Sequence, residues 1–198
     1  MSVAVDVLGV AKTFGDGPDA VHAFGPLDLE VEGGSFVALL GPSGCGKSTL
    51  LKMVANLLAP SSGSLRWWGG GFDHVGEEGR KLVFVFQDAT LMPWASVRGN
   101  VRLPLDLAGM DRRAADERVN QALALVGLAK FDGAYPRQLS GGMQMRASIA
   151  RALVTDPNLL LMDEPFGALD EFTRNKLDQD LLELWQKKNL SVVFVDRK

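Results

Sequence analysis

Residues 41–48 read Gly-Pro-Ser-Gly-Cys-Gly-Lys-Ser, a full match to the pattern G-x-x-x-x-G-K-[ST]. An apolar run, Phe36–Leu40, precedes this segment and is expected to form a buried strand, and Thr49–Val54 is expected to form a helix after it. Glycines let backbone N–H groups close around phosphate oxygens, and the start of a helix adds partial positive charge. The pattern therefore predicts a strand, a phosphate-binding loop and a helix, as in an α/β fold.

The side chains of this loop suit a nucleotide bound with a metal ion. Lys47 can reach the β- and γ-phosphates, and the Ser48 hydroxyl can ligate Mg²⁺. Cys45 is the single cysteine, so we interpret it as a small residue tolerated near the ligand, with a redox role as the alternative. The residues expected to contact the nucleotide here are Gly41, Pro42, Ser43, Gly44, Cys45, Gly46, Lys47, Ser48 and Thr49.

Composition excludes several classes of protein. The chain has 198 residues, 46% of them apolar and 23% charged, which is normal for a single soluble globular domain. Its net charge of −3 provides no basic field for nucleic acid. No apolar stretch reaches the roughly 18 residues of a membrane span, and no signal peptide is visible at the N-terminus. We therefore expect a cytosolic, reducing compartment.

Hydrophobic periodicity predicts the other elements. Alternating residues in Val3–Leu8 and Leu27–Val31 predict a small antiparallel sheet, and Pro60–Gly63 is expected to be a loop. Further strands are expected at Leu82–Phe86, Leu159–Met162 and Ser191–Val195, and further helices after the caps Asp111, Ser140 and Asp170.

An acidic pair, Asp163-Glu164, directly follows the apolar run Leu159–Met162. The carboxyl end of a parallel strand is well placed beside a phosphate loop. There Asp163 would hold Mg²⁺, directly or through water, and Glu164 would orient and deprotonate an attacking water. The alternative is a solvated acidic pair at the end of a strand.

A second anion-binding helix start is predicted at Leu139–Gln144, which reads Leu-Ser-Gly-Gly-Met-Gln. Ser140 can cap this helix, and Gly141 and Gly142 open it. Because the chain already has one phosphate loop, the second site needs another phosphate to hold. Two copies packed head to tail would let each helix touch the nucleotide of its partner.

These segments together resemble the ATP-binding cassette family of transport ATPases, which convert ATP and water to ADP and phosphate. The resemblance covers essentially the whole chain and rests on Gly41–Ser48, Leu139–Gln144, Leu159–Glu164 and Glu164–Asp170. It implies an α/β P-loop NTPase with a mostly parallel core sheet, an N-terminal antiparallel β subdomain and an inserted α-helical subdomain. The catalytic core would comprise residues 1–87 and 156–198, and the helical subdomain residues 88–155.

The resemblance also implies three further site residues. Gln87 resembles the glutamine that reaches Mg²⁺ and water and senses the membrane partner; the alternative is a polar strand end. Phe14 resembles the aromatic residue that stacks on adenine; the alternative is a packed core residue. Asp170 resembles the residue that links two sites across the dimer; the alternative is a simple N-cap. The implied cofactors are ATP and Mg²⁺, with Lys47, Gln87 and Glu164 catalytic and Ser48, Gln87 and Asp163 at the metal.

The amino-acid sequences of three segments, Gln87–Trp94, Leu139–Met143 and Pro165–Asp170, resemble those of the nitrate, sulfonate, taurine and bicarbonate importers. That group implies an ATP-dependent head-to-tail homodimer, integral membrane permease subunits, an indirect periplasmic solute-binding partner and no nucleic acid. It implies a peripheral location at the cytoplasmic face of the bacterial inner membrane. The segment Gln87–Gly109 would receive a permease helix, unless its apolar residues belong to the subdomain core.

The C-terminal end departs from the family pattern. Family members follow the strand with Thr-His-Asp, whereas this chain has Asp196, Arg197 and Lys198. Arg197 stands where the family has a histidine that contacts the γ-phosphate, and neither His22 nor His74 is positioned to replace it. We therefore expect a C-terminally truncated copy. Three functions remain possible from the sequence: an importer ATPase, a nucleotide-binding module that barely hydrolyses ATP, and an ATPase acting on DNA or ribosomes. The acidic net charge disfavours the last.

Overall fold

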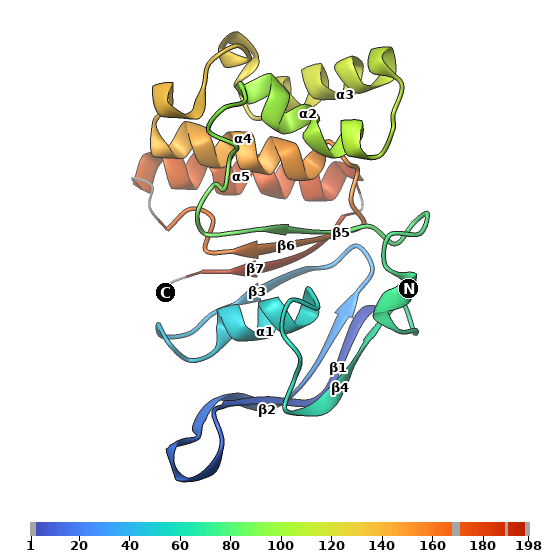
Figure 1. Cartoon of the computed structure of the whole chain (residues 1–198), viewed down its shortest axis with the longest axis vertical. Helices are drawn as coiled ribbons and strands as arrows, with labels where there is room; N and C mark the ends of the chain where they lie inside the picture. The colour runs from blue at the N-terminus through green and yellow to red at the C-terminus, as the bar shows by residue number, and fades with distance from the viewer. Residues whose placement is uncertain (1–2, 168–170, 189, 197–198) are drawn as a thin grey trace. The chain divides into compact units, whose positions relative to one another are not determined.

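The computed structural model describes residues 3–167, 171–188 and 190–196. The chain divides into two compact units (Figure 1). The first comprises Met1–Phe84, Asn158–Glu164 and Leu184–Lys198, and the second comprises Val85–Pro157 and Pro165–Glu183.

A four-stranded sheet carries the phosphate loop. Its strands are β3 (Phe36–Leu39), β5 (Leu82–Val85), β6 (Leu159–Asp163) and β7 (Ser191–Val195), in the order β3-β7-β6-β5. Strand β7 pairs in parallel with both β3 and β6. Every residue of β6 and β7 is buried, which explains why these strands are apolar without alternation.

The strand before the phosphate loop forms as predicted, but the prediction that it is buried is wrong. Phe36, Val37 and Leu39 are only partly buried, Ala38 is exposed, and Leu40 is 63% exposed. Among the described strands β3 lies at an edge of the sheet, so it has a neighbouring strand on one side only. Its apolar composition therefore does not by itself put it in the core.

The predicted antiparallel sheet is confirmed and has three strands. They are β1 (Val3–Phe14), β2 (Val21–Glu32) and β4 (Ser62–Trp67), in the order β2-β1-β4. Both β2 and β4 pair antiparallel with β1. The polar turn between β1 and β2 contains a short 3₁₀-helix, η1 (Gly17–Asp19).

The prediction of a loop at Pro60–Gly63 is wrong for its last two residues, because Ser62 and Gly63 begin β4. Gly63 has a φ of 80°, a left-handed conformation that favours glycine. A Cβ there would collide with the Gly9 carbonyl of β1. The glycine thus permits close pairing of two strands rather than a turn.

Helix α1 (Lys47–Val54) lies between the two sheets of the first unit (Figure 1). The indole Nε1 of Trp67 donates to the Val54 carbonyl at 2.8 Å and fastens the end of the helix to β4. Apolar residues from both sheets and the helix form one core, among them Val5, Val7, Val10, Leu50, Leu51, Met53, Leu159, Leu161, Val193 and Val195. This packing sets the start of α1 relative to the ends of the strands.

The second unit is helical. Helices α2 (Val97–Leu107), α3 (Arg112–Leu125) and α4 (Gly141–Leu153) pack against one another. The predicted caps hold, because Asp111 accepts from two backbone amides of α3 and Ser140 accepts from one of α4. Sequence reasoning missed α2, where Pro104 lies inside the helix and weakens the helical signal.

Helix α5 (Glu171–Lys188) follows, and its predicted cap Asp170 lies outside the described residues. Leu181 is buried, and the indole of Trp185 donates to the Gly34 carbonyl at 2.8 Å. Short 3₁₀-helices occur at η2 (Phe72–His74), η3 (Ala129–Phe131) and η4 (Pro136–Gln138). No helix among the described residues combines the length and apolar character that crossing a membrane requires.

Candidate functional site

The phosphate loop depends on backbone conformations that glycine adopts readily. Gly44 and Gly46 have φ values of 81° and 94°. A Cβ at Gly46 would lie 2.7 Å from the Ala23 carbonyl oxygen and 2.8 Å from Phe24 Cβ. Gly46 therefore supplies both a left-handed conformation and close packing of the loop against β2.

The start of α1 suits an anion. Its N-cap is Gly46, which has no side chain to accept hydrogen bonds from the first helical amides. The preceding residues of the loop, from Pro42 to Cys45, are exposed. Because helix amides and the helix dipole favour negative charge at this end, the loop is a suitable cradle for phosphate.

Lys47 supplies a positive charge inside this cradle. Its side chain is only 8% exposed, and its ammonium donates to the carbonyl oxygens of Gly41 at 2.7 Å and Pro42 at 2.9 Å. The Cys45 sulfur lies 3.8 Å from the same nitrogen. The carbonyls stabilise a charge that burial would otherwise penalise, and they hold it at the loop.

Ser48 and Asp163 meet although they are 115 residues apart in the sequence. The serine hydroxyl donates to Asp163 Oδ1 at 2.7 Å, and Asp163 is buried at the carboxyl end of β6. Hydroxyl and carboxylate oxygens are ligands that Mg²⁺ prefers, and this ion is usually held by one or two carboxylates with substrate phosphates. Among the described residues no group of three or more histidines, cysteines or acids could hold a metal ion. The candidate ligands for Mg²⁺ are therefore named by chemistry as Ser48 and Asp163.

Glu164 is held in an unusual backbone conformation next to this pair. Its φ is 46°, and its amide donates to the Val195 carbonyl at 3.1 Å. A non-glycine residue in the left-handed region costs about 1–3 kcal/mol, and such residues concentrate at functional sites. Glu164 is buried and directly follows Asp163, the candidate metal ligand. Its backbone amide is tied to the end of β7.

Phe14 ends β1 and is 44% exposed, so it is not a packed core residue. It pairs with Val21, and Lys12 pairs with Phe24 across the hairpin. Since Gly46 packs against Phe24, the end of the hairpin lies beside the phosphate loop. The β1–β2 hairpin therefore borders the phosphate loop, and stacking of a base on Phe14 stays a prediction.

The second glycine-rich helix start has the expected cap. The Ser140 hydroxyl accepts from the Met143 amide at 3.3 Å, and Gly141 is exposed. The Gln144 side chain donates to the carbonyls of Pro136 and Leu139 at 3.1 and 3.3 Å and fastens the chain before the helix. The segment is thus a preformed helix N-terminus open to solvent.

The remaining predicted positions are Gln87, Asp170 and Arg197. Gln87 is exposed just beyond β5 and belongs to the second unit. Asp170 lies outside the described residues, as does Arg197, where the family histidine is expected.

The segment Ala89–Ser96, which we call the tryptophan loop, is tightly fastened within the second unit. Asn100 is fully buried, accepts from the Met92 amide at 2.6 Å, and donates to the carbonyls of Met92, Ala95 and Ser96, each at 3.1 Å. The loop carries Trp94, which is 75% exposed. Sequence reasoning named this region but missed Asn100, because a single polar residue in an unrecognised helix gives no pattern.

A second anchor of the tryptophan loop is Arg151 on α4. Its guanidinium donates to the Thr90 carbonyl and hydroxyl, both at 3.0 Å, and to the Ala89 carbonyl at 3.3 Å. Burial lowers the pKa of Arg151 from its ordinary value. Within Gln87–Gly109, Leu105 is buried in the core of this unit, as the alternative interpretation of that segment expected.

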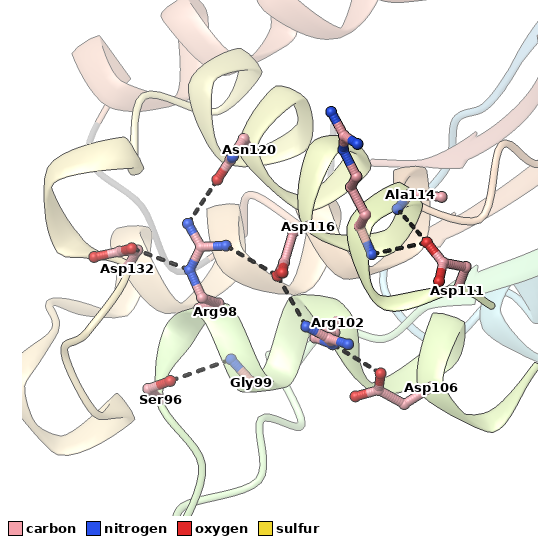
Figure 2. A network of polar contacts seen from close by, with 11 residues as sticks. Ser96, Arg98, Gly99, Arg102, Asp106, Asp111, Ala114, Asp116, Asn120 and Asp132 are labelled. Carbon is pink, nitrogen blue, oxygen red and sulfur yellow. Dashed lines mark hydrogen bonds and ion pairs between the residues drawn. The ribbon is translucent and has the colours of Figure 1, made fainter. Parts of the chain in front are cut away.

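Figure 2 shows a polar network that joins α2 to α3. Asp116 lies 2.8 Å from Arg102 and 3.6 Å from Arg98, and Arg98 also pairs with Asp132 at 3.1 Å. A hydrogen bond with Asp106 raises the pKa of Arg102. These ion pairs join α2 to α3 and to Asp132 after η3.

Comparison with known proteins extends these observations. Residues 24–167 match the family described as ABC transporter. The aliphatic sulfonates import ATP-binding protein SsuB of Bacillus cereus is 41% identical over 98% of this chain and 74% of its own length. The taurine import ATP-binding protein TauB of Rhizobium johnstonii is 45% identical over 88% of this chain and 66% of its own length.

The fold agrees with these matches. A solved dimeric ATP-binding cassette, in a post-hydrolysis state bound to ADP and Pi, superposes with a TM-score of 0.86. It is 33% identical in sequence, and the match covers 97% of this chain and 87% of that one. The predicted fold class, an α/β P-loop NTPase with parallel and antiparallel sheets and a helical part, is confirmed. The chain belongs to the ABC transporter family.

Proposed function

We propose that this chain is the ATP-binding and ATP-hydrolysing subunit of an importer for a small nitrate-, sulfonate- or taurine-like solute. The contact between Ser48 and Asp163 carries the proposal, because it brings the phosphate loop to the acidic strand end with Glu164 next in the chain. Similarity to the SsuB and TauB proteins supports the importer class.

The residues of the site would divide the chemistry among them. Bound Mg-ATP supplies the phosphoryl group and the metal charge that stabilises its transfer. Lys47 would give up one or both of its carbonyl partners for phosphate oxygens, and Ser48 and Asp163 would hold the ion. Glu164 would orient a water and accept its proton. Gln87 would contact the metal and the water, the role that the family resemblance implies.

The helix start at Ser140, Gly141 and Gly142 would complete the site of a second copy. We infer an ATP-dependent head-to-tail homodimer, since this helix N-terminus is open to an anion and the chain's own loop would hold the phosphates of its own nucleotide. The dimeric state of the related solved cassette supports this arrangement. Asp170 would link the two sites across that dimer.

The tryptophan loop would receive the permease subunits. A rigid, partly apolar loop with an exposed tryptophan suits an interface, where aromatic residues are enriched. The chain would then act peripherally at the cytoplasmic face of the inner membrane, with a periplasmic solute-binding protein as an indirect partner.

Steady-state ATPase activity tests this function. Glu164→Gln removes the proton acceptor while preserving shape, so turnover should fall by about 10²–10⁴-fold. Equilibrium binding should show that ATP affinity is retained in the variant, which separates chemistry from binding. Turnover equal to that of the unchanged chain would contradict the role of Glu164.

A second candidate is a nucleotide-binding module that hydrolyses ATP poorly. It rests on Arg197 in place of the family histidine, because a guanidinium cannot both donate and accept hydrogen bonds at neutral pH. The same assay separates the two functions. ATP binding with a turnover that Glu164→Gln does not lower would favour the module.

A further inference from the structure

Lys12 lies over the ring of Phe14. The two residues are two positions apart in β1 and therefore share one face of the strand. The ammonium nitrogen is 5.2 Å from the ring centroid, within the range of a cation–π interaction. Phe14 nevertheless keeps 44% of its surface exposed, so part of the ring remains available to a ligand.

The cation is itself held in place. The Lys12 ammonium donates to the Ala59 carbonyl at 2.9 Å. The end of β1 is tied to the same segment, since the Thr13 amide donates to the Ser61 hydroxyl and that hydroxyl donates to the Thr13 carbonyl, both at 3.1 Å. The Ser61 amide adds a bond of 2.8 Å to the Ala11 carbonyl. Lys12 is thus a fixed charge on a fastened strand end.

We propose that Lys12 is a positioning residue for recognition of the nucleotide base. Its ammonium holds one face of the Phe14 ring, which leaves the other face oriented for the base to stack. The inference rests on the proposed function, in which adenine stacks on Phe14. A ring held in one orientation before binding loses less conformational freedom when the base arrives, so the contact favours the complex.

The placement of the hairpin supports this role. Lys12 pairs with Phe24, and Phe24 packs against Gly46 at the start of α1. The cation–π pair therefore lies on β1, directly beside β2, the strand that borders the phosphate loop. The phosphates themselves would be served by Lys47 and the loop amides. This separation predicts that Lys12 affects the base and not the phosphates.

Calorimetric titration with Mg-ATP and with magnesium tripolyphosphate, which has no base, tests the proposal. Lys12→Met keeps the stem of the side chain and removes the charge. Loss of the ring's orientation should weaken ATP binding about two- to fivefold, at most what an exposed cation–π contact contributes, and leave tripolyphosphate binding unchanged. Lys12→Arg restores the cation and should restore ATP affinity. Equal weakening of both ligands, or no weakening of ATP, would overturn the proposal.

A double-mutant cycle with Phe14→Ala isolates the mechanism. In that background Lys12→Met should have no further effect on ATP, because the ring through which the charge acts is gone. An undiminished effect would overturn the positioning role. Unchanged ATP affinity in Phe14→Ala alone would refute stacking together with this inference. A separate variant tests the proposed nucleotide function itself. If Lys47→Ala leaves the affinities for ATP and tripolyphosphate unchanged, that function fails, whatever the result for Lys12.

Discussion

Asn100 illustrates how much one buried side chain organises in this protein. Its amide satisfies one backbone N–H and three carbonyls of the tryptophan loop, and it is fully buried. Buried polar groups are costly unless they are paired, so the loop and the side chain each need the other. Trp94 can then be exposed on a segment that is nevertheless rigid.

Asn100→Ala should lower the free energy of unfolding by about 1–3 kcal/mol, because it leaves buried backbone groups without their partner. Urea unfolding measures this difference. Gln121→Ala on the exposed side of α3 is the matched control and should change stability by less than about 0.5 kcal/mol. Equal stability of the Asn100 variant and the control would show that water replaces the amide at no cost.

At the scale of elements, two helix starts differ in how they are capped. Helix α1 begins after a glycine with no side-chain cap, whereas the Ser140 hydroxyl caps α4. For the uncapped start of α1, the predicted partner is a phosphate of the nucleotide bound by the same chain. The Ser140 hydroxyl caps the start of α4, yet Gly141 remains exposed there. The proposed dimer would give this exposed helix start a partner.

Gly141→Asp separates these two roles of α4. A Cβ at Gly141 meets no atom within 4 Å, and a carboxylate in the first turn favours a helix. Thermal stability should therefore be unchanged or slightly higher, while repulsion from the partner's phosphates should abolish the ATP-induced dimer. Light scattering with Mg-ATP and the Glu164→Gln background, which retains ATP, measures the association.

Gly133→Asp is the control for added charge, because a Cβ there also meets no atom within 4 Å. It should leave the dimer intact. An ATP-induced dimer of normal stability in the Gly141 variant would argue against a phosphate contact at α4.

At the scale of the whole molecule, the phosphate loop, Asp163 and Phe14 belong to the first compact unit. A ligand that binds only the folded state stabilises it by mass action, so nucleotide binding should be visible in the stability of the chain.

Mg-ATP at about 100 times its dissociation constant should stabilise the protein by about 2.7 kcal/mol. Removing Mg²⁺ with a chelator should reduce this gain, since Ser48 and Asp163 would lose the ion they are proposed to hold. Ser48→Ala should make this stabilisation less sensitive to the chelator. Lys47→Ala should reduce the stabilisation that a fixed concentration of Mg-ATP provides. Thermal melts with and without chelator check both expectations, and a gain independent of Mg²⁺ in the unchanged chain would exclude the metal site.

The elements that local sequence determines were predicted well. Glycines at 44 and 46 supply the conformations of the phosphate loop, and Asp111 and Ser140 cap the helices that they precede. These features depend on interactions within a few residues, so a single sequence is sufficient to predict them. The order Leu159–Glu164 likewise predicted an acidic strand end, although its contact with Ser48 required the assumption of a parallel sheet.

Tertiary structure decided the features that depend on distant neighbours. Strand β3 is less buried than its apolar residues predict because it lies at a sheet edge, and Ser62 and Gly63 join a strand because β1 is there to pair with them. The burial of Asn100 and the contact between Lys12 and Ala59 were invisible in the sequence for the same reason. Chain packing determines which polar groups must find partners, and residue type alone does not specify where those partners will be.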